Sequence, residues 1–296
     1  MGTEQMRGIF YMLAAMAVIS VQETLAKYLG QYLPVMMVLW ARYLGHLILM
    51  VILLWPKHGT SLFRASRPMM QAGRSLILMI DSLLFFTGLT MIGLAEATAI
   101  FFTVPMLVVV LSIPILGERV GWRSLCATLV GFIGTLVIVR PDIGGTDMEG
   151  LGTGALFILA AAFCMATFNV TTRKLANSDP MPVTLFYTAL IGAVASSLAV
   201  PFFWQMPEGT NVWLALVAIG LFGGLAHSLI IAAHKYAAAT TVAPFMYSQI
   251  FWALLLGWAM FDSLPDIYAW VGGGIVILSG LYLIHRGRVD GKSPAP

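Results

Sequence analysis

Long apolar stretches alternate with short polar connections along the whole chain. A helix that rises 1.5 Å per residue needs about 20 apolar residues to cross a hydrocarbon core roughly 30 Å thick. The stretches are continuous rather than alternating, so they indicate helices and not barrel strands, and helices satisfy their own backbone polar groups in lipid. The pattern predicts ten spans, at residues 8–30, 33–55, 72–92, 95–116, 122–140, 152–174, 182–204, 212–234, 240–261 and 267–285.

Composition supports this interpretation. Apolar residues make up 59% of the 296 residues and charged residues only 10%, which excludes a soluble globular domain. The first apolar stretch is long enough for a full span, so we expect an uncleaved first helix rather than a signal peptide. We therefore expect an all-α, multi-pass integral membrane protein.

Basic residues gather on one side of the predicted bundle. The connections on that side, together with both chain ends, contain thirteen Lys and Arg residues, against Lys27 and Arg140 on the other side. Cytoplasmic loops retain such residues, so we predict that both termini are cytoplasmic and that the chain lies in the inner (plasma) membrane. The net charge of +3 then reflects topology, and no nucleic-acid partner is expected.

Two apolar helices share residues at a constant offset of 146. The first contains Lys27 and Leu29, followed by Pro34, and the second contains Arg173 and Leu175, followed by Pro180. Five spans separate the two helices, so they should cross the membrane in opposite directions. This predicts two five-helix halves, residues 1–146 and 147–296, as an inverted repeat, an arrangement whose substrate site usually lies between the halves near the midplane. At a slightly different offset, Glu118 matches Asp262.

The first half carries a set of polar, Gly and Pro positions. They are Lys27, Arg42, Glu96 to Ala99, Pro105, Gly117 to Arg119, Gly131 and Gly134. This set resembles the EamA-type family of the drug/metabolite transporter superfamily, and the resemblance covers nearly the whole chain. The second half keeps the pattern more loosely, with Arg173, Thr188, Gln249 and Asp262 at the matching positions. The resemblance implies ten helices, alternating access and, most often, export of small metabolites or drugs from bacteria.

Three charged residues fall at a similar depth in the predicted bundle. Glu23 lies roughly 10 Å, Arg42 roughly 13 Å and Asp81 roughly 16 Å from the outer ends of their helices, at 1.5 Å per residue. A charge at membrane depth is costly and should face a cavity or a partner. Thr24 and Lys27 extend the same helical face as Glu23. The acids either pair with Lys27 and Arg42 in a structural network, or they bind a substrate carboxylate or amine and carry protons at Glu23 and Asp81.

Other candidate substrate contacts lie in the second half. Asn169 occupies the repeat-related position of the acid in the first helix, and His227 lies in the eighth span. Tyr247, Ser248 and Trp252 form a stripe in the ninth span. Interhelical hydrogen bonding and packing are the alternative roles for all five.

We therefore predict a secondary transporter that exports small charged or amphipathic metabolites, such as amino acids or related carboxylates, by alternating access with proton coupling or exchange. A cationic drug exporter of the same family is one alternative. An intramembrane hydrolase is another, because Ser279 with His227, or Asp81 alone, would suit membrane proteases, although the partner motifs are missing. A non-transporting scaffold or receptor is a third.

Cofactors and enzymatic chemistry are not expected. Gly291 to Ser293 lacks the glycine spacing of a phosphate-binding loop, and Cys126 and Cys164 lie far from metal-ligand spacing. The expected partners are a small-molecule substrate and the lipid bilayer. The sequence leaves the oligomeric state open, a homodimer included.

Overall fold

The computed structural model describes residues 3–117, 122–139, 149–175, 178–236, 245–262 and 265–290, and every regular element within these ranges is helical. The first half contains α1 (Thr3–Leu29), α2 (Val35–His58), η1 (Gly59–Phe63), α3 (Pro68–Met91), α4 (Leu94–Phe101), α5 (Val104–Leu116) and α6 (Trp122–Val139). The second half contains α7 (Glu149–Leu175), α8 (Met181–Ala199), η2 (Val200–Phe203), α9 (Thr210–Tyr236), α11 (Gln249–Phe261) and α12 (Ile267–Asp290).

Seven helical segments of the described residues are long and apolar enough to cross a membrane. Two more apolar helices, Gln249–Phe261 and Ile267–Tyr282, are shorter. The expected all-helical membrane architecture is confirmed, whereas the count of ten spans stays a prediction. Glu118, Arg119 and Arg140, which the sequence analysis used, lie outside the described residues.

Helix boundaries repeat along the chain. The offset of 146 that joins Thr3–Leu29 to Glu149–Leu175 also joins the first residues of α2 and α8, each of which follows a proline, Pro34 or Pro180. Proline cannot extend the preceding helix but is compatible with the start of the next one. α5 and α11 end on left-handed residues 145 positions apart, Gly117 (φ 71°) and Asp262 (φ 50°). The left-handed ends of α5 and α11 thus correspond to each other at an offset of 145.

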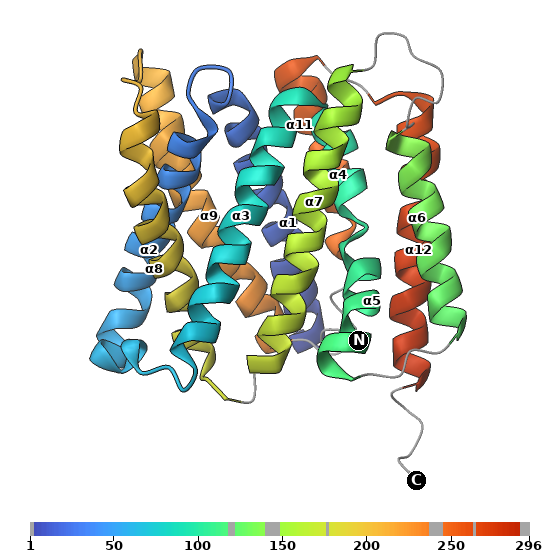
Figure 1. The fold of residues 1–296 in the computed structure, drawn as a ribbon, viewed down its shortest axis with the longest axis horizontal. Helices are drawn as coiled ribbons and strands as arrows, with labels where there is room; N and C mark the ends of the chain where they lie inside the picture. Colours follow the sequence, from blue (N-terminus) through green and yellow to red (C-terminus); the bar gives the residue numbers. More distant parts are fainter. Residues whose placement is uncertain are drawn as a thin grey trace.

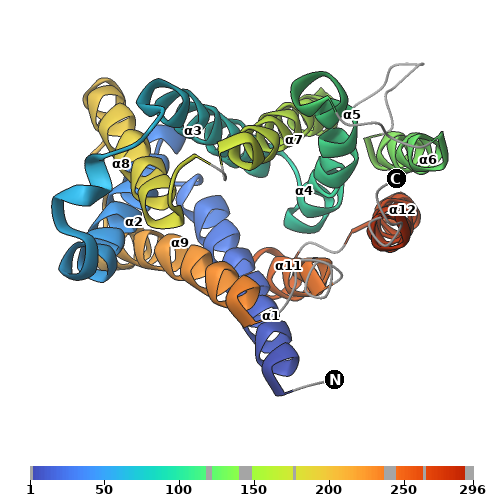
Figure 2. The same cartoon turned by 90° about the horizontal axis from the view of Figure 1, so that it is seen from below.

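Helix packing repeats in the same way. α1 packs along α9, and α7, the counterpart of α1, packs along α3. α2 packs against α8 and α6 against α12, so each of these helices contacts its own counterpart. The pair α6 and α12 stands at one side of the bundle (Figure 2). In Figure 1, α1 starts at the lower end of the bundle and α7 at the upper end, and both chain termini lie at the lower end.

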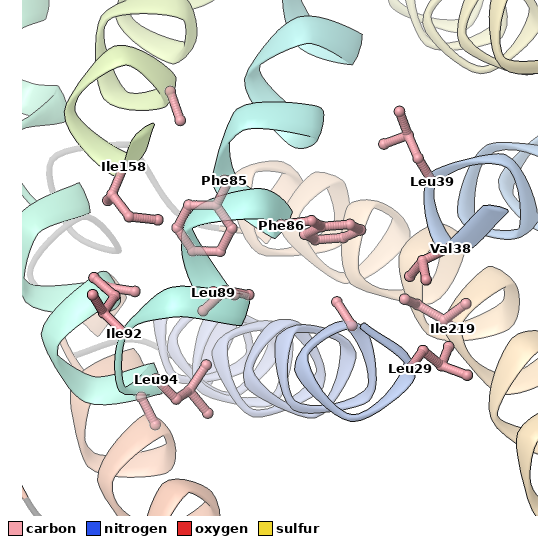
Figure 3. Packing of buried hydrophobic residues seen from close by; sticks show 14 of the residues in the cluster. Leu29, Val38, Leu39, Phe85, Phe86, Leu89, Ile92, Leu94, Ile158 and Ile219 are labelled. Carbon is pink, nitrogen blue, oxygen red and sulfur yellow. The ribbon is translucent and has the colours of Figure 1, made fainter. Parts of the chain in front are cut away.

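The two ends of the bundle are packed differently. We call the end that holds the chain termini the proximal end, and the end where α1 stops at Leu29 the distal end. Toward the distal end, Leu29 belongs to a buried apolar cluster with Phe85, Phe86 and Leu89 of α3 (Figure 3). Toward the proximal end, Met12 of α1 instead belongs to a smaller cluster whose other buried members come from α1 and α9. The distal half of α1 is therefore the part that packs into the cluster shared with α3.

One span is interrupted, and the interruption has a counterpart. Helix α4 ends at Phe101 and α5 begins at Val104, and a turn at residues 102–103 separates them. A turn at residues 247–248, 145 positions later, precedes α11. The Thr103 hydroxyl donates to the Ile100 carbonyl at 2.8 Å, and the Ser248 hydroxyl donates to the carbonyl three residues earlier at 2.7 Å. Both turns are thus held by the same local bond.

Candidate functional site

The first part of the site is a polar face on α1, where Ser20, Glu23 and Thr24 are buried. The Gln249 side chain donates from Nε2 to Glu23 Oε1 at 2.9 Å, and the Ser20 hydroxyl lies 3.3 Å from the Gln249 carbonyl oxygen. Thr24 donates to the Ser20 carbonyl at 2.7 Å, so its hydroxyl is used within α1. Glu23 Oε2 is buried without a hydrogen-bond partner.

The second part of the site surrounds the guanidinium of Arg42 on α2. Arg42 Nη1 donates to the hydroxyl of Ser82, and the hydroxyl of Tyr43 lies 3.3 Å from the same oxygen. The guanidinium carbon lies 5.1 Å from the ring centre of Tyr43 and 5.5 Å from that of Phe86. Arg42 is therefore positioned by one hydroxyl and two aromatic faces.

The charges of the two parts interact electrostatically. Asp81 is 4% exposed, and the charges of Arg42 and Glu23 both act on it. No nitrogen of Arg42 lies within 4 Å of a carboxyl oxygen of Glu23 or Asp81, and Asp81 Oδ1 has no hydrogen-bond partner. The structure therefore contains no closed Arg42–Asp81 ion pair, and one carboxyl oxygen of each acid has no hydrogen-bond partner.

Lys27 lies apart from these acids. Its Nζ donates to the carbonyl oxygens of Leu89, at 2.7 Å, and Ile92, at 2.5 Å, where α3 ends. It makes no ion pair with Glu23 within 4 Å, so the predicted Glu23–Lys27 pair is absent. Lys27 caps the carbonyl end of α3, a position that favours a positive charge.

His227 approaches the site from α9. Its ring centre lies 4.9 Å from that of His46 on α2, and its Nδ1 lies 3.0 Å from the Gly223 carbonyl oxygen. The charge of Arg42 acts on both rings. His46 Nε2 is buried without a partner. His46 was not among the candidate residues, because a single histidine in a span gives no signal of its neighbour.

The remaining candidates lie elsewhere. Asn169 is exposed on α7, and no hydrogen bond joins it to the acids. Trp252 packs against the cluster around Met12, and Ser248 holds the turn before α11. The Tyr247 ring lies 4.9 Å from the ring of Phe102, so the two interrupted segments meet through these side chains. Glu23, Arg42, Asp81 and His227 are thus the candidates that the structure brings together.

Sequence reasoning missed three neighbours of the charged residues. Ser82 and Tyr43 position Arg42, and Gln249 binds Glu23. Gln249 had been noted only as a departure from the repeat, yet a polar residue within an apolar span was a usable signal. The described part of the chain contains no group of three or more His, Cys, Asp or Glu side chains placed to bind a metal.

Arg74 differs from its predicted location. It was counted among the basic residues of the connections, but it is buried between α3, α7 and α8 and only 3% exposed. Its guanidinium donates to Thr172 Oγ1, the Thr184 carbonyl and Thr188 Oγ1 at 2.8, 3.0 and 2.5 Å. The prediction that both termini are cytoplasmic therefore depends on the other twelve basic residues.

Comparison with known proteins identifies the class. The EamA-like transporter family matches residues 6–140 and 152–285, so one family pattern occurs twice in the chain. The chain belongs to the EamA-like transporter family, and it is a membrane transporter rather than an enzyme. The hydrolase and scaffold alternatives are therefore set aside, and the resemblance to the drug/metabolite transporter superfamily is confirmed.

Several curated relatives carry substrate names. The chain is 27% identical over 278 residues to an "S-adenosylmethionine uptake transporter" of Rickettsia felis, which covers 94% of this chain and 92% of that protein. It is 32% identical over 189 residues to a "Riboflavin transporter" of Vibrio cholerae, which covers 64% and 61% of the two chains. A solved structure titled "Crystal structure of protein" matches 98% of this chain and 99% of its own with a TM-score of 0.63 at 20% identity, which shows a shared fold.

Proposed function

We propose that this protein is a secondary transporter with ten membrane crossings, built from two five-helix repeats of opposite orientation and with both termini in the cytoplasm. The equal lengths of α1 and α7 at an offset of 146 support this arrangement, as do the matched packing pairs α1–α9 and α7–α3. The substrate site lies between the repeats, because Glu23 and Arg42 come from the first repeat and Gln249 from the second. Alternating access then moves this site between the two compartments.

The observation that carries the proposal is the incomplete charge cluster. Glu23 Oε2 and Asp81 Oδ1 are buried and unpartnered, while Arg42 lies near both without an ion pair. A buried polar group without a partner costs about 1–3 kcal/mol, so a structural network would be expected to close. A ligand that carries both a carboxylate and an amine would satisfy Arg42 and the acids together.

The substrate is therefore a small zwitterionic metabolite, an amino acid or a related carboxylate. S-adenosylmethionine has an amino-acid group and a purine, so the name of the Rickettsia relative agrees with this class. We propose import as the direction, because that relative is named an uptake transporter. The expectation of export rested only on what is common in the family.

The flux test uses purified protein in proteoliposomes, with radiolabelled S-adenosylmethionine and riboflavin as separate probes. We expect saturable uptake of S-adenosylmethionine and, for Arg42→Gln, a loss of about tenfold or more, since one charge-assisted contact contributes at least about 1.5 kcal/mol. Riboflavin, which carries neither a carboxylate nor an ammonium group, should be taken up less well. Arg64→Gln is the matched control, because Arg64 is exposed beside η1. No uptake of S-adenosylmethionine, a preference for riboflavin, or equal loss in both variants would contradict the proposal.

Proton coupling at Glu23 and Asp81 is the second part of the proposal. Glu23→Gln and Asp81→Asn keep side-chain size but remove the titrating group. Each should flatten the dependence of uptake on external pH, while Glu208→Gln, at an exposed position before α9, should leave it unchanged. Unchanged pH dependence in both site variants would exclude these carboxyl groups as the proton carriers.

A further inference from the structure

An open pocket occupies the distal end of the bundle and has a volume of about 1140 Å³. The last turns of α1 and α11 and the connection between α3 and α4 line it. In Figure 1 these segments meet at the upper end, opposite the chain termini. The side chains relevant here are those of Lys27, Tyr28, Tyr32, Trp258, Phe261 and Asp262.

Four aromatic side chains line this pocket, those of Tyr28, Tyr32, Trp258 and Phe261. The Tyr28 and Tyr32 ring centres lie 5.0 Å apart and are tilted by 56°. Tyr32 is 50% exposed and Trp258 is 54% exposed, so packing within the bundle covers neither side chain fully. Such rings bind flat ring systems by stacking.

Lys27 supplies a positive charge in the same pocket. Its Nζ donates to the carbonyl oxygens of Leu89 and Ile92 and lies 5.5 Å from the Phe261 ring centre. No carboxyl oxygen of a described residue lies within 4 Å of it, Asp262 included. Neutral carbonyls bind an ammonium less strongly than a carboxylate does. A ligand carboxylate would therefore compete well for this group.

We propose that the distal pocket is a second ligand site, for a molecule with a flat ring and a carboxylate. The aromatic side chains bind the ring, and Lys27 binds the carboxylate. The same Nζ links α1 to the end of α3 through its hydrogen bonds to the Leu89 and Ile92 carbonyls. A bound carboxylate that takes over Lys27 therefore breaks this link at the distal end. Lys27 lies one helical turn from Glu23, so the pocket adjoins the charged cluster. Its place on the transport path rests on the proposed function, whereas ligand binding itself does not.

Three probes with one ring system separate the carboxylate from the ring. We would measure binding of indole-3-acetate, indole and tryptamine to the full chain in nanodiscs by calorimetry. Indole-3-acetate should bind about tenfold or more tightly than tryptamine, because their side chains carry opposite charges. Equal binding of the two charged probes would overturn the proposal, since an aromatic belt at a membrane surface has no such preference.

Variants then assign the preference to residues. Lys27→Met should remove the advantage of indole-3-acetate, and Lys57→Met, at an exposed lysine of α2, should preserve it. Trp258→Ala should weaken all three probes to a similar extent. If Lys27→Met does not fold, Lys27→Arg, which keeps the charge, should retain the order of affinities while Tyr32→Ala weakens every probe. An unchanged affinity order in Lys27→Met would contradict the assignment.

Arg42→Gln distinguishes this proposal from the proposed function. The variant should lose uptake yet bind indole-3-acetate as the wild type does. Loss of binding in Arg42→Gln would mean that the probe occupies the charged cluster, which would overturn the second site. Normal probe binding with no uptake in the wild type would instead contradict the transport function and leave the pocket assignment intact.

Discussion

Asp179 joins the two halves at the proximal end, and its removal should lower stability measurably. It lies in the connection between α7 and α8, outside the membrane-spanning helices. Its Oδ1 accepts the Ser66 backbone N–H at 2.6 Å, and its Oδ2 accepts Gln71 Nε2 at 2.8 Å. Gln71 Nε2 also donates to Thr184 Oγ1 at 3.1 Å. One carboxylate thus holds the start of α3 beside the start of α8.

The magnitude follows from these bonds. Hydrogen bonds to a charged acceptor contribute about 1.5–3 kcal/mol each, and Asp179→Ala leaves the Ser66 N–H without its acceptor while Gln71 retains Thr184. We expect the free energy of unfolding to fall by about 2–4 kcal/mol. Asp179→Asn should cost about 1 kcal/mol, because its amide oxygen still accepts from Ser66 and the Gln71 amide can turn.

The assay is unfolding by SDS in mixed micelles, followed by intrinsic fluorescence. Glu208→Ala is the control, since Glu208 is exposed in the connection before α9. A fall of less than about 0.5 kcal/mol for Asp179→Ala, the range of ordinary surface substitutions, would refute the reasoning.

The same residue predicts a pH dependence. Burial raises the pKa of Asp179, but the hydrogen bonds from Gln71 and Ser66 outweigh it and leave the pKa below its usual range. The stabilisation is therefore complete above the ordinary carboxyl pKa of about 3.9 and is lost as the pH falls through the lower folded-state pKa. The difference in unfolding free energy between wild type and Asp179→Ala should be constant near neutral pH and shrink below about pH 4. A difference that grew with acidity would contradict the assigned sign.

Two further substitutions test the fold around the site. Asp262→Gly should raise the free energy of unfolding by about 0.5–1 kcal/mol, because Asp262 has the left-handed backbone conformation that Gly117 has in the first half. Gly117→Asp should lower the free energy of unfolding by a similar amount. If chemical unfolding shows no difference for either variant, the backbone is not strained at Asp262. Gly192→Ala should lower the free energy of unfolding by about 1–3 kcal/mol and lower uptake, because an added Cβ would overlap the Tyr43 ring beside Arg42. Gly274→Ala is the control, because a Cβ added there meets nothing within 4 Å. Equal behaviour of the two variants would contradict the tight contact between Gly192 and Tyr43.

Helix positions were the most predictable feature of this chain, and side-chain partners the least. The apolar pattern placed the spans because each helix must be apolar over its whole membrane thickness, and the repeated Pro34 and Pro180 marked where α2 and α8 begin. The interruption at residues 102–103 was less visible, because Pro105 signals a break without fixing its position.

The charged residues show why the site was only partly predictable. The proximity of Glu23, Arg42 and Asp81 was predictable, because residue number and helical rise alone give their similar depth in the membrane. Depth does not fix rotation about the helix axis or the neighbouring helix. Lys27 therefore bonds to carbonyls of α3 rather than to Glu23, and Arg74 is buried rather than exposed.

The central claim is that Arg42 belongs to a substrate site and not to a structural network. The measurement uses purified wild type and purified Arg42→Gln. It determines, for each protein, the affinity for the radiolabelled probe that the wild type transports and the free energy of unfolding. We predict an affinity loss of about tenfold or more with a change in stability below about 1 kcal/mol, because Arg42 would lose its contacts with the Ser82 hydroxyl and with the rings of Tyr43 and Phe86. Unchanged affinity together with a large loss of stability would contradict the account.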